Sequence, residues 1–111
     1  MEENKLKERK KLSRSAILTS EISYKTDFFD IKYSKHCLER LEERLDGSIK
    51  FLPKVVRITE NNIYFGETLD EKTLSLATVR INYKSDKWLF LVIDLKTKLV
   101  VTVYFKNKIK N

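Results

Sequence analysis

The chain has very few of the residues that build phosphate loops and disulfide frameworks. It contains only two glycines and one proline in 111 residues, so no Gly-rich nucleotide-binding motif is present. Its one cysteine cannot form an internal disulfide, and one cysteine with one histidine is too few for a four-ligand zinc site. We therefore expect no cofactor and no metal, and a reducing compartment.

Long apolar runs are also absent from the sequence. No stretch approaches the ~20 apolar residues that cross a bilayer, and the charged N-terminus is not followed by the apolar core of a signal peptide. These absences predict a cytoplasmic protein with no membrane partner. The length predicts one domain with one hydrophobic core.

Positive charge is what the chain has in excess. Lys and Arg number 23 against 16 Asp and Glu, which gives a formal net charge of +7. Polyanions, and nucleic acid first among them, are the natural partners of such a chain. Because a charge excess also serves solubility, it does not locate a site. Residues 1–27 are predicted to form a basic N-terminal arm or helix, partly flexible, and residues 28–111 a single α+β domain.

The stretch from Tyr33 to Leu45 holds the only histidine and the only cysteine. Ser34 is a suitable N-cap for a helix over this stretch. The helix would align three side chains at four-residue spacing, namely His36, Arg40 and Arg44. A separate apolar stripe consists of Cys37, Leu38, Leu41 and Leu45. We interpret Cys37 as a core residue rather than a nucleophile.

The remaining elements are predicted from periodicity. Pro53 suits the first turn of a second helix through Glu60, and Ile63–Gly66 suits a short strand. From Thr73 onward, three alternating runs are separated by polar breaks at 84–86 and 96–98. They predict an antiparallel meander. The fold class is therefore α+β, with N-terminal helices packed on an antiparallel three- to four-stranded meander sheet.

The faces of the predicted strands follow from alternation. The middle run, Trp88–Leu95, is apolar on both faces and should be central, so that Trp88 and Phe90 build the core rather than stack on bases. In the last run, one face would carry Leu99, Val101, Val103 and Phe105. The other face would carry Val100, Thr102 and Tyr104.

These features together resemble a small family of uncharacterised domains. The resemblance covers about Phe28 to Lys106 and lies in the His-x3-Arg-x3-Arg helix, at His36, Arg40 and Arg44, and in the strand Val-Val-Thr-Val-Tyr that ends at Tyr104. The family is similar to the barnase, colicin D and RelE-like ribonuclease superfamily. The resemblance implies a RelE/barnase-like fold, a toxin that cuts RNA without metal, and RNA as partner. It also raises a cognate antitoxin or immunity protein as a further partner.

The residue types suit metal-free RNA cleavage, which needs a base for the 2′-hydroxyl, donors for the charge on phosphorus and an acid for the leaving oxygen. His36, close to the helix start and one turn from Arg40, is the candidate base or acid. The other predicted catalytic residues are Arg40, Thr102 and Tyr104. Arg44 and Arg80 are the predicted substrate-binding residues.

Plainer interpretations remain open for the same residues. His36 can satisfy backbone groups at the helix start, and Arg40 can form an ordinary exposed pair with Glu43. Thr102 and Tyr104 are good strand formers and need no function. Two functions therefore stay open: a metal-independent endoribonuclease of toxin type, or a non-catalytic module that binds nucleic acid or inhibits another protein.

Overall fold

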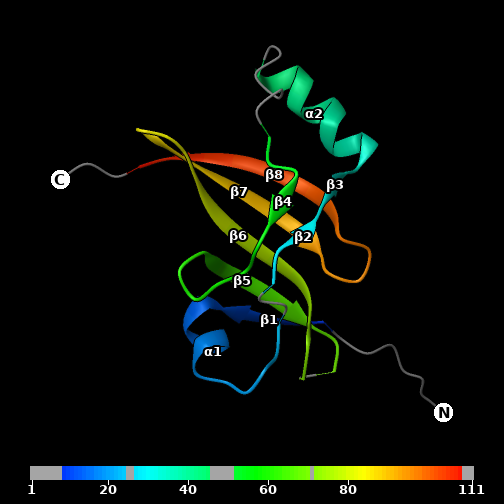
Figure 1. The fold of residues 1–111 in the computed structure, drawn as a ribbon, viewed down its shortest axis with the longest axis vertical. Coiled ribbons are helices and arrows are strands. Elements are labelled where there is room, and N and C mark those ends of the chain that lie inside the picture. The colour runs from blue at the N-terminus through cyan, green and yellow to red at the C-terminus, as the bar shows by residue number, and fades with distance from the viewer. Residues whose placement is uncertain (1–8, 25–26, 46–51, 71, 109–111) are drawn as a thin grey trace.

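The computed structural model describes residues 9–24, 27–45, 52–70 and 72–108. Within these residues the chain forms mostly strands and has two helices (Figure 1). In order, the elements are β1 (Lys10–Ser13), α1 (Arg14–Leu18), β2 (Phe29–Asp30), β3 (Lys32–Tyr33), α2 (Lys35–Leu45), β4 (Val55–Val56), β5 (Ile63–Thr68), β6 (Leu74–Lys84), β7 (Lys87–Asp94) and β8 (Leu99–Asn107). In this part of the chain, neither helix has the length and apolar character needed to cross a bilayer.

The main sheet has six strands in the order β1-β5-β6-β7-β8-β3. All neighbours in it are antiparallel except β3 and β8, which are parallel. A two-stranded ribbon of β2 and β4 lies across one face of this sheet, and α2 lies beside β8 (Figure 1). The predicted fold class is wrong, because strands dominate and the sheet is mixed and six-stranded.

The predicted helix from Pro53 to Glu60 is also wrong, because β4 and extended chain occupy this segment. Burial here alternates with a period of two: Val56 and Ile58 are buried, whereas Val55 and Arg57 are exposed. Alternation of this kind is the signature of a half-buried strand.

Part of the N-terminal segment belongs to the sheet. β1 pairs antiparallel with β5, with Lys10 opposite Thr68. Arg14 of α1 donates from Nε to the carbonyl of Ile63 at 3.1 Å, which holds α1 against the start of β5. Of the predicted basic arm, residues 1–8 and 25–26 lie outside the described residues.

The three alternating runs predicted from the sequence do pair as consecutive antiparallel strands β6, β7 and β8, and β7 is interior as expected. The ladder between β7 and β8 contains a bulge, because Val92 pairs with Thr102 whereas Ile93 pairs with Val100. The extra residue, Val101, is exposed. The predicted faces of β8 therefore hold from Thr102 onward and are inverted before Val101.

One hydrophobic core covers one face of the sheet. Its fully buried centre includes Leu89, Leu91 and Ile93 of β7. The helices and the ribbon contribute Ile17, Cys37, Leu41, Phe29 and Val56 to the same cluster. The prediction that Trp88 builds the core is wrong, because Trp88 is only half-buried and lies outside this cluster. Phe90 is buried as predicted, but it alternates with the core residues of β7 and lies on the opposite face of the sheet.

The cap of α2 provides a first prediction. The Ser34 hydroxyl accepts from the Cys37 backbone N–H at 3.0 Å, which confirms Ser34 as the predicted N-cap. Ser34→Ala should lower the free energy of unfolding by about 1 kcal/mol, because a helix-end donor loses its partner. Urea unfolding measures the change. Ser34→Asp, which restores an acceptor, should remain close to wild type, and an equal loss in both variants would contradict the capping role.

Candidate functional site

The position of α2 is set by its cap, its buried side and the strand before it. β3 pairs in parallel with β8, and the Ser34 N–H donates to the Val100 carbonyl at 3.0 Å just before α2 begins. Cys37 and Leu41 are each 3% exposed and pack into the core. Because successive helix residues are about 100° apart, His36 and Arg40 are then held at the exposed side of α2, along β8.

His36, Arg40 and Thr102 line one small hollow of about 100 Å³ between α2 and β8. Its other lining residues are Cys37, Leu41, Val101 and Val103. The bulge at Val101 leaves both Val101 and Thr102 exposed at the sheet edge that faces the helix. An imidazole, a guanidinium and a hydroxyl thus meet at one place, and these groups suit the binding of a phosphate.

The other predicted site residues lie elsewhere. Tyr104 does not line the hollow, because its ring stacks on Phe90 on the sheet face opposite the core. Arg80, opposite Phe90 in the ladder, is on that same face. α2 includes the backbone of Arg44, but the Arg44 side chain is outside the described part of the chain.

Two groups near the buried side of α2 hold their protons, Cys37 of the helix and Tyr33 of β3. The Tyr33 hydroxyl donates to the Pro53 carbonyl at 2.6 Å, and burial, with a smaller contribution from Cys37, raises the pKa of Tyr33. Burial also raises the pKa of the Cys37 thiol. Cys37 is therefore a core residue, as predicted, and its thiol is a poor nucleophile at neutral pH.

A second group of residues was missed by the sequence reasoning. Tyr64, Trp88, Phe90 and Tyr104 gather with Arg80, Lys106 and Lys108 on the face opposite the core. The available signal was the alternation of β7, which has aromatic residues at Trp88 and Phe90 between aliphatic ones. The prediction that these rings build the core follows from the apolar residues on both faces of β7.

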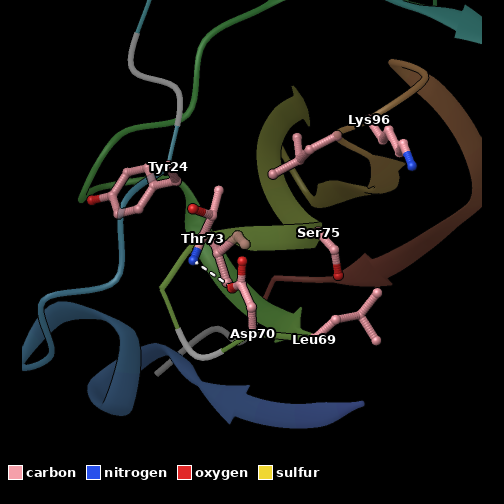
Figure 2. Close-up of a pocket in the computed structure, with 8 residues that line it drawn as sticks. Tyr24, Leu69, Asp70, Thr73, Ser75 and Lys96 are labelled. Carbon is pink, nitrogen blue, oxygen red and sulfur yellow. Dashed lines mark hydrogen bonds between the residues drawn. The ribbon is translucent and has the colours of Figure 1, made fainter. Parts of the chain in front are cut away.

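A hollow of about 350 Å³ lies at another part of the sheet, and its lining residues include Tyr24, Asp70, Thr73 and Lys96. Figure 2 shows Thr73 beside Asp70 in this hollow. The Asp70 carboxylate accepts from the backbone N–H groups of Lys72 at 2.9 Å and Thr73 at 3.0 Å. These bonds lower the pKa of Asp70 and hold the turn between β5 and β6. Asp70 therefore has a structural role that accounts for its position.

Among the described residues, no group of three or more His, Cys, Asp or Glu side chains is placed to hold a metal ion. Comparison of the chain with protein-family models, curated proteins and solved structures gave no match. The resemblance to ribonuclease toxins therefore rests on the residues of the helix and the last strand alone.

The burial of Cys37 predicts slow alkylation. In the native protein, iodoacetamide should modify Cys37 roughly tenfold or more slowly than in the urea-unfolded chain, because the thiol is covered and its pKa is raised. Mass spectrometry of timed samples measures the rate. Equal rates in the native and unfolded protein would show that Cys37 is reactive and accessible.

The turn at Asp70 predicts a stability difference that depends on pH. Because its pKa is lowered in the folded state, the contribution of the carboxylate is complete above the unfolded pKa and is lost as pH falls through the folded pKa. Asp70→Asn should therefore be less stable than wild type at pH 7, and the difference should shrink in strong acid. Urea unfolding across this range measures it, with Asp86→Asn in the β6–β7 turn as control. A difference that does not change with pH would contradict the role of the charge.

Proposed function

We propose that this protein cleaves RNA in the hollow between α2 and β8, as a metal-independent endoribonuclease of toxin type. The observation that carries the proposal is the meeting of His36, Arg40 and Thr102 at one hollow. The positive net charge of +7 supports a polyanionic substrate. The resemblance of the helix and the last strand to ribonuclease toxins supports RNA as that substrate.

The electrostatics of α2 favour an anion at this place. His36 is the second residue of the helix, near the backbone N–H groups of its first turn, and this turn contains no acidic residue. Such a helix start attracts a phosphate. Arg40 is one turn further along and can offer two donors in a fork that matches the phosphate oxygens.

The proposed reaction uses the 2′-hydroxyl of RNA as the nucleophile. His36 takes the proton of this hydroxyl, the 2′-oxygen bonds to phosphorus, and the bond from phosphorus to the 5′-oxygen breaks. Arg40 and the Thr102 hydroxyl stabilise the charge that develops on the phosphate oxygens. The 5′-oxygen then takes a proton from water or from the imidazolium of His36. The products are a 2′,3′-cyclic phosphate and a 5′-hydroxyl, so DNA is spared.

The proposal predicts that cleavage depends on His36. In buffer containing EDTA, wild type should cleave single-stranded RNA, and His36→Ala should do so at least about 100-fold more slowly, because a positioned acid–base group contributes that much or more. Denaturing gels and mass spectrometry of the ends measure cleavage and the cyclic phosphate. Lys35→Ala is the matched control, since Lys35 is on α2 but does not line the hollow.

Equal cleavage by wild type and His36→Ala, or none by wild type, would refute this proposal. Cleavage at a site where a single 2′-hydroxyl has been replaced by hydrogen would also refute it. His36→Ala purified in parallel reveals any contaminating ribonuclease.

A non-catalytic nucleic-acid-binding module is the second candidate function. It is favoured because the lining of the hollow offers few groups for proton transfer. Besides His36 the lining residues include Cys37, whose raised pKa keeps the thiol protonated. For such a module, His36→Ala would have little effect on binding. Arg40→Gln would weaken binding and reduce its dependence on salt.

A further inference from the structure

We infer that the sheet face opposite the core binds single-stranded nucleic acid by stacking bases on its aromatic rings. We call it the aromatic face, defined by Tyr64, Arg80, Trp88, Phe90, Tyr104 and Lys106, with Lys108 at its margin. The inference deepens the proposed function by assigning a substrate-binding surface apart from the α2–β8 hollow. It rests on that function only for the choice of RNA as the natural ligand.

Strand register places these residues on one face. In the ladders, Phe90 is opposite both Arg80 and Tyr104, and Trp88 is opposite Lys106. Residues that are directly opposite share a face. The two neighbours of Phe90 on β7, Leu89 and Leu91, are fully buried in the core on the other side. Regular alternation in this part of the β6, β7 and β8 ladders therefore places their members of the aromatic face together. Tyr64 lies at an irregularity of β5 and joins them through its contact with Phe90.

The rings form a packed layer with Phe90 as its floor. Tyr104 stacks on Phe90 with ring centroids 4.9 Å apart and planes 2° apart, and Tyr64 meets Phe90 edge-on at 4.9 Å. Phe90 is only 2% exposed although it is outside the core cluster, whereas Tyr64 is 39% exposed. The layer is thus closely packed underneath and exposes part of its ring surface, as a stacking site requires.

Cations lie over these rings. The Arg80 guanidinium carbon is 4.1 Å and the Lys108 ammonium 4.6 Å from the centre of the Trp88 ring. The Lys106 ammonium is 5.5 Å from the Phe90 ring and 5.9 Å from those of Tyr64 and Tyr104. At these distances each cation is attracted to the ring. Charge for phosphates and ring surface for bases therefore occur side by side.

The shape and charge of the surface favour one class of ligand. A hollow of about 440 Å³ lies between these side chains, and none of its lining residues is acidic. A base can stack on an exposed ring only when it is not already stacked within a duplex. The surface therefore fits a single strand, whose bases are free and whose phosphates meet the cations.

The same residues also have a purely structural explanation, and an experiment must distinguish it from ligand binding. Lysine and arginine stems can shield apolar surface from water without any ligand. On that explanation, changes at the aromatic face alter stability alone. If the face binds nucleic acid, the same changes alter the affinity for single strands in a protein that remains folded.

The first experiment uses the single tryptophan as the probe. Trp88 is the only tryptophan, so its fluorescence reports directly on this face. Titration of wild type with a single-stranded deoxythymidine oligonucleotide should give saturable quenching, and a duplex of equal length should quench less. This oligonucleotide has no 2′-hydroxyl and cannot be cleaved by the proposed reaction. The measurement therefore succeeds or fails independently of ribonuclease activity.

The second experiment separates stacking from charge, with affinity measured by the anisotropy of a labelled oligonucleotide. Trp88→Leu should weaken binding by roughly tenfold or more, as removal of a base–aromatic stack does, whereas Trp88→Phe should retain most of it. Lys106→Gln with Lys108→Gln should reduce the salt dependence, by about 0.7 in the slope of log affinity against log salt for each phosphate that is no longer neutralised. Lys72→Gln with Lys96→Gln removes the same charge away from the aromatic face and should bind as wild type does.

Several results would overturn the inference. They are the absence of quenching, equal losses of affinity in the two double-lysine variants, and equal affinity for Trp88→Leu and wild type. Equal or tighter binding of duplex DNA, or of vesicles of anionic phospholipid, would overturn it as well. Circular dichroism shows whether each variant is folded, so a stability effect is not taken for a binding effect.

Discussion

The structure depends on the burial of one face of a single sheet. Leu89, Leu91 and Ile93 of β7 are fully buried at the centre of the core, and both helices and the β2–β4 ribbon pack their apolar side chains against that same face. A domain of this length forms one hydrophobic core. In the described part of the chain, the second face is therefore left to the side chains of the sheet itself, and there the rings and cations collect.

The same one-sided core determines which side chains of α2 face β8 and solvent. Cys37 and Leu41 are committed to the core, so His36 and Arg40, each one residue earlier, are turned toward β8 and solvent. A regular β8 could not complete this hollow as observed. Val100 must face the core, where it is fully buried, and the bulge at Val101 allows Thr102 to point away from the core only two residues later. Bulges often reorient side chains in this way beside functional sites.

Local signals in the sequence predicted local structure well. The α2 helix, its Ser34 cap, its buried Cys37 and the antiparallel order of β6, β7 and β8 all follow from capping and periodicity. The pairing of β1 with β5 was not predictable in this way, because short basic strands owe their structure to a distant partner. The β-branched residues around Val56 and Ile58 do not alternate in the sequence and fit a helical period as well. The alternation that marks a strand is seen only in the burial of Val56 and Ile58. The bulge in β8 could not be predicted from the sequence, since it inverts the faces of the strand without any change in composition.

Strand β8 connects the two proposed sites. After the bulge, alternate positions of β8 are occupied by Thr102, Tyr104 and Lys106. Thr102 lines the α2–β8 hollow, whereas Tyr104 and Lys106 belong to the aromatic face. Alternate residues of a strand are about 6.8 Å apart, so the surface from the hollow to Lys106 is continuous along one strand. A single nucleic-acid strand that followed β8 would meet the aromatic rings and the α2–β8 hollow in succession. Stacking on the rings needs no 2′-hydroxyl whereas the proposed reaction does, so the proposed binding at the aromatic face and the proposed chemistry at the hollow can be measured separately.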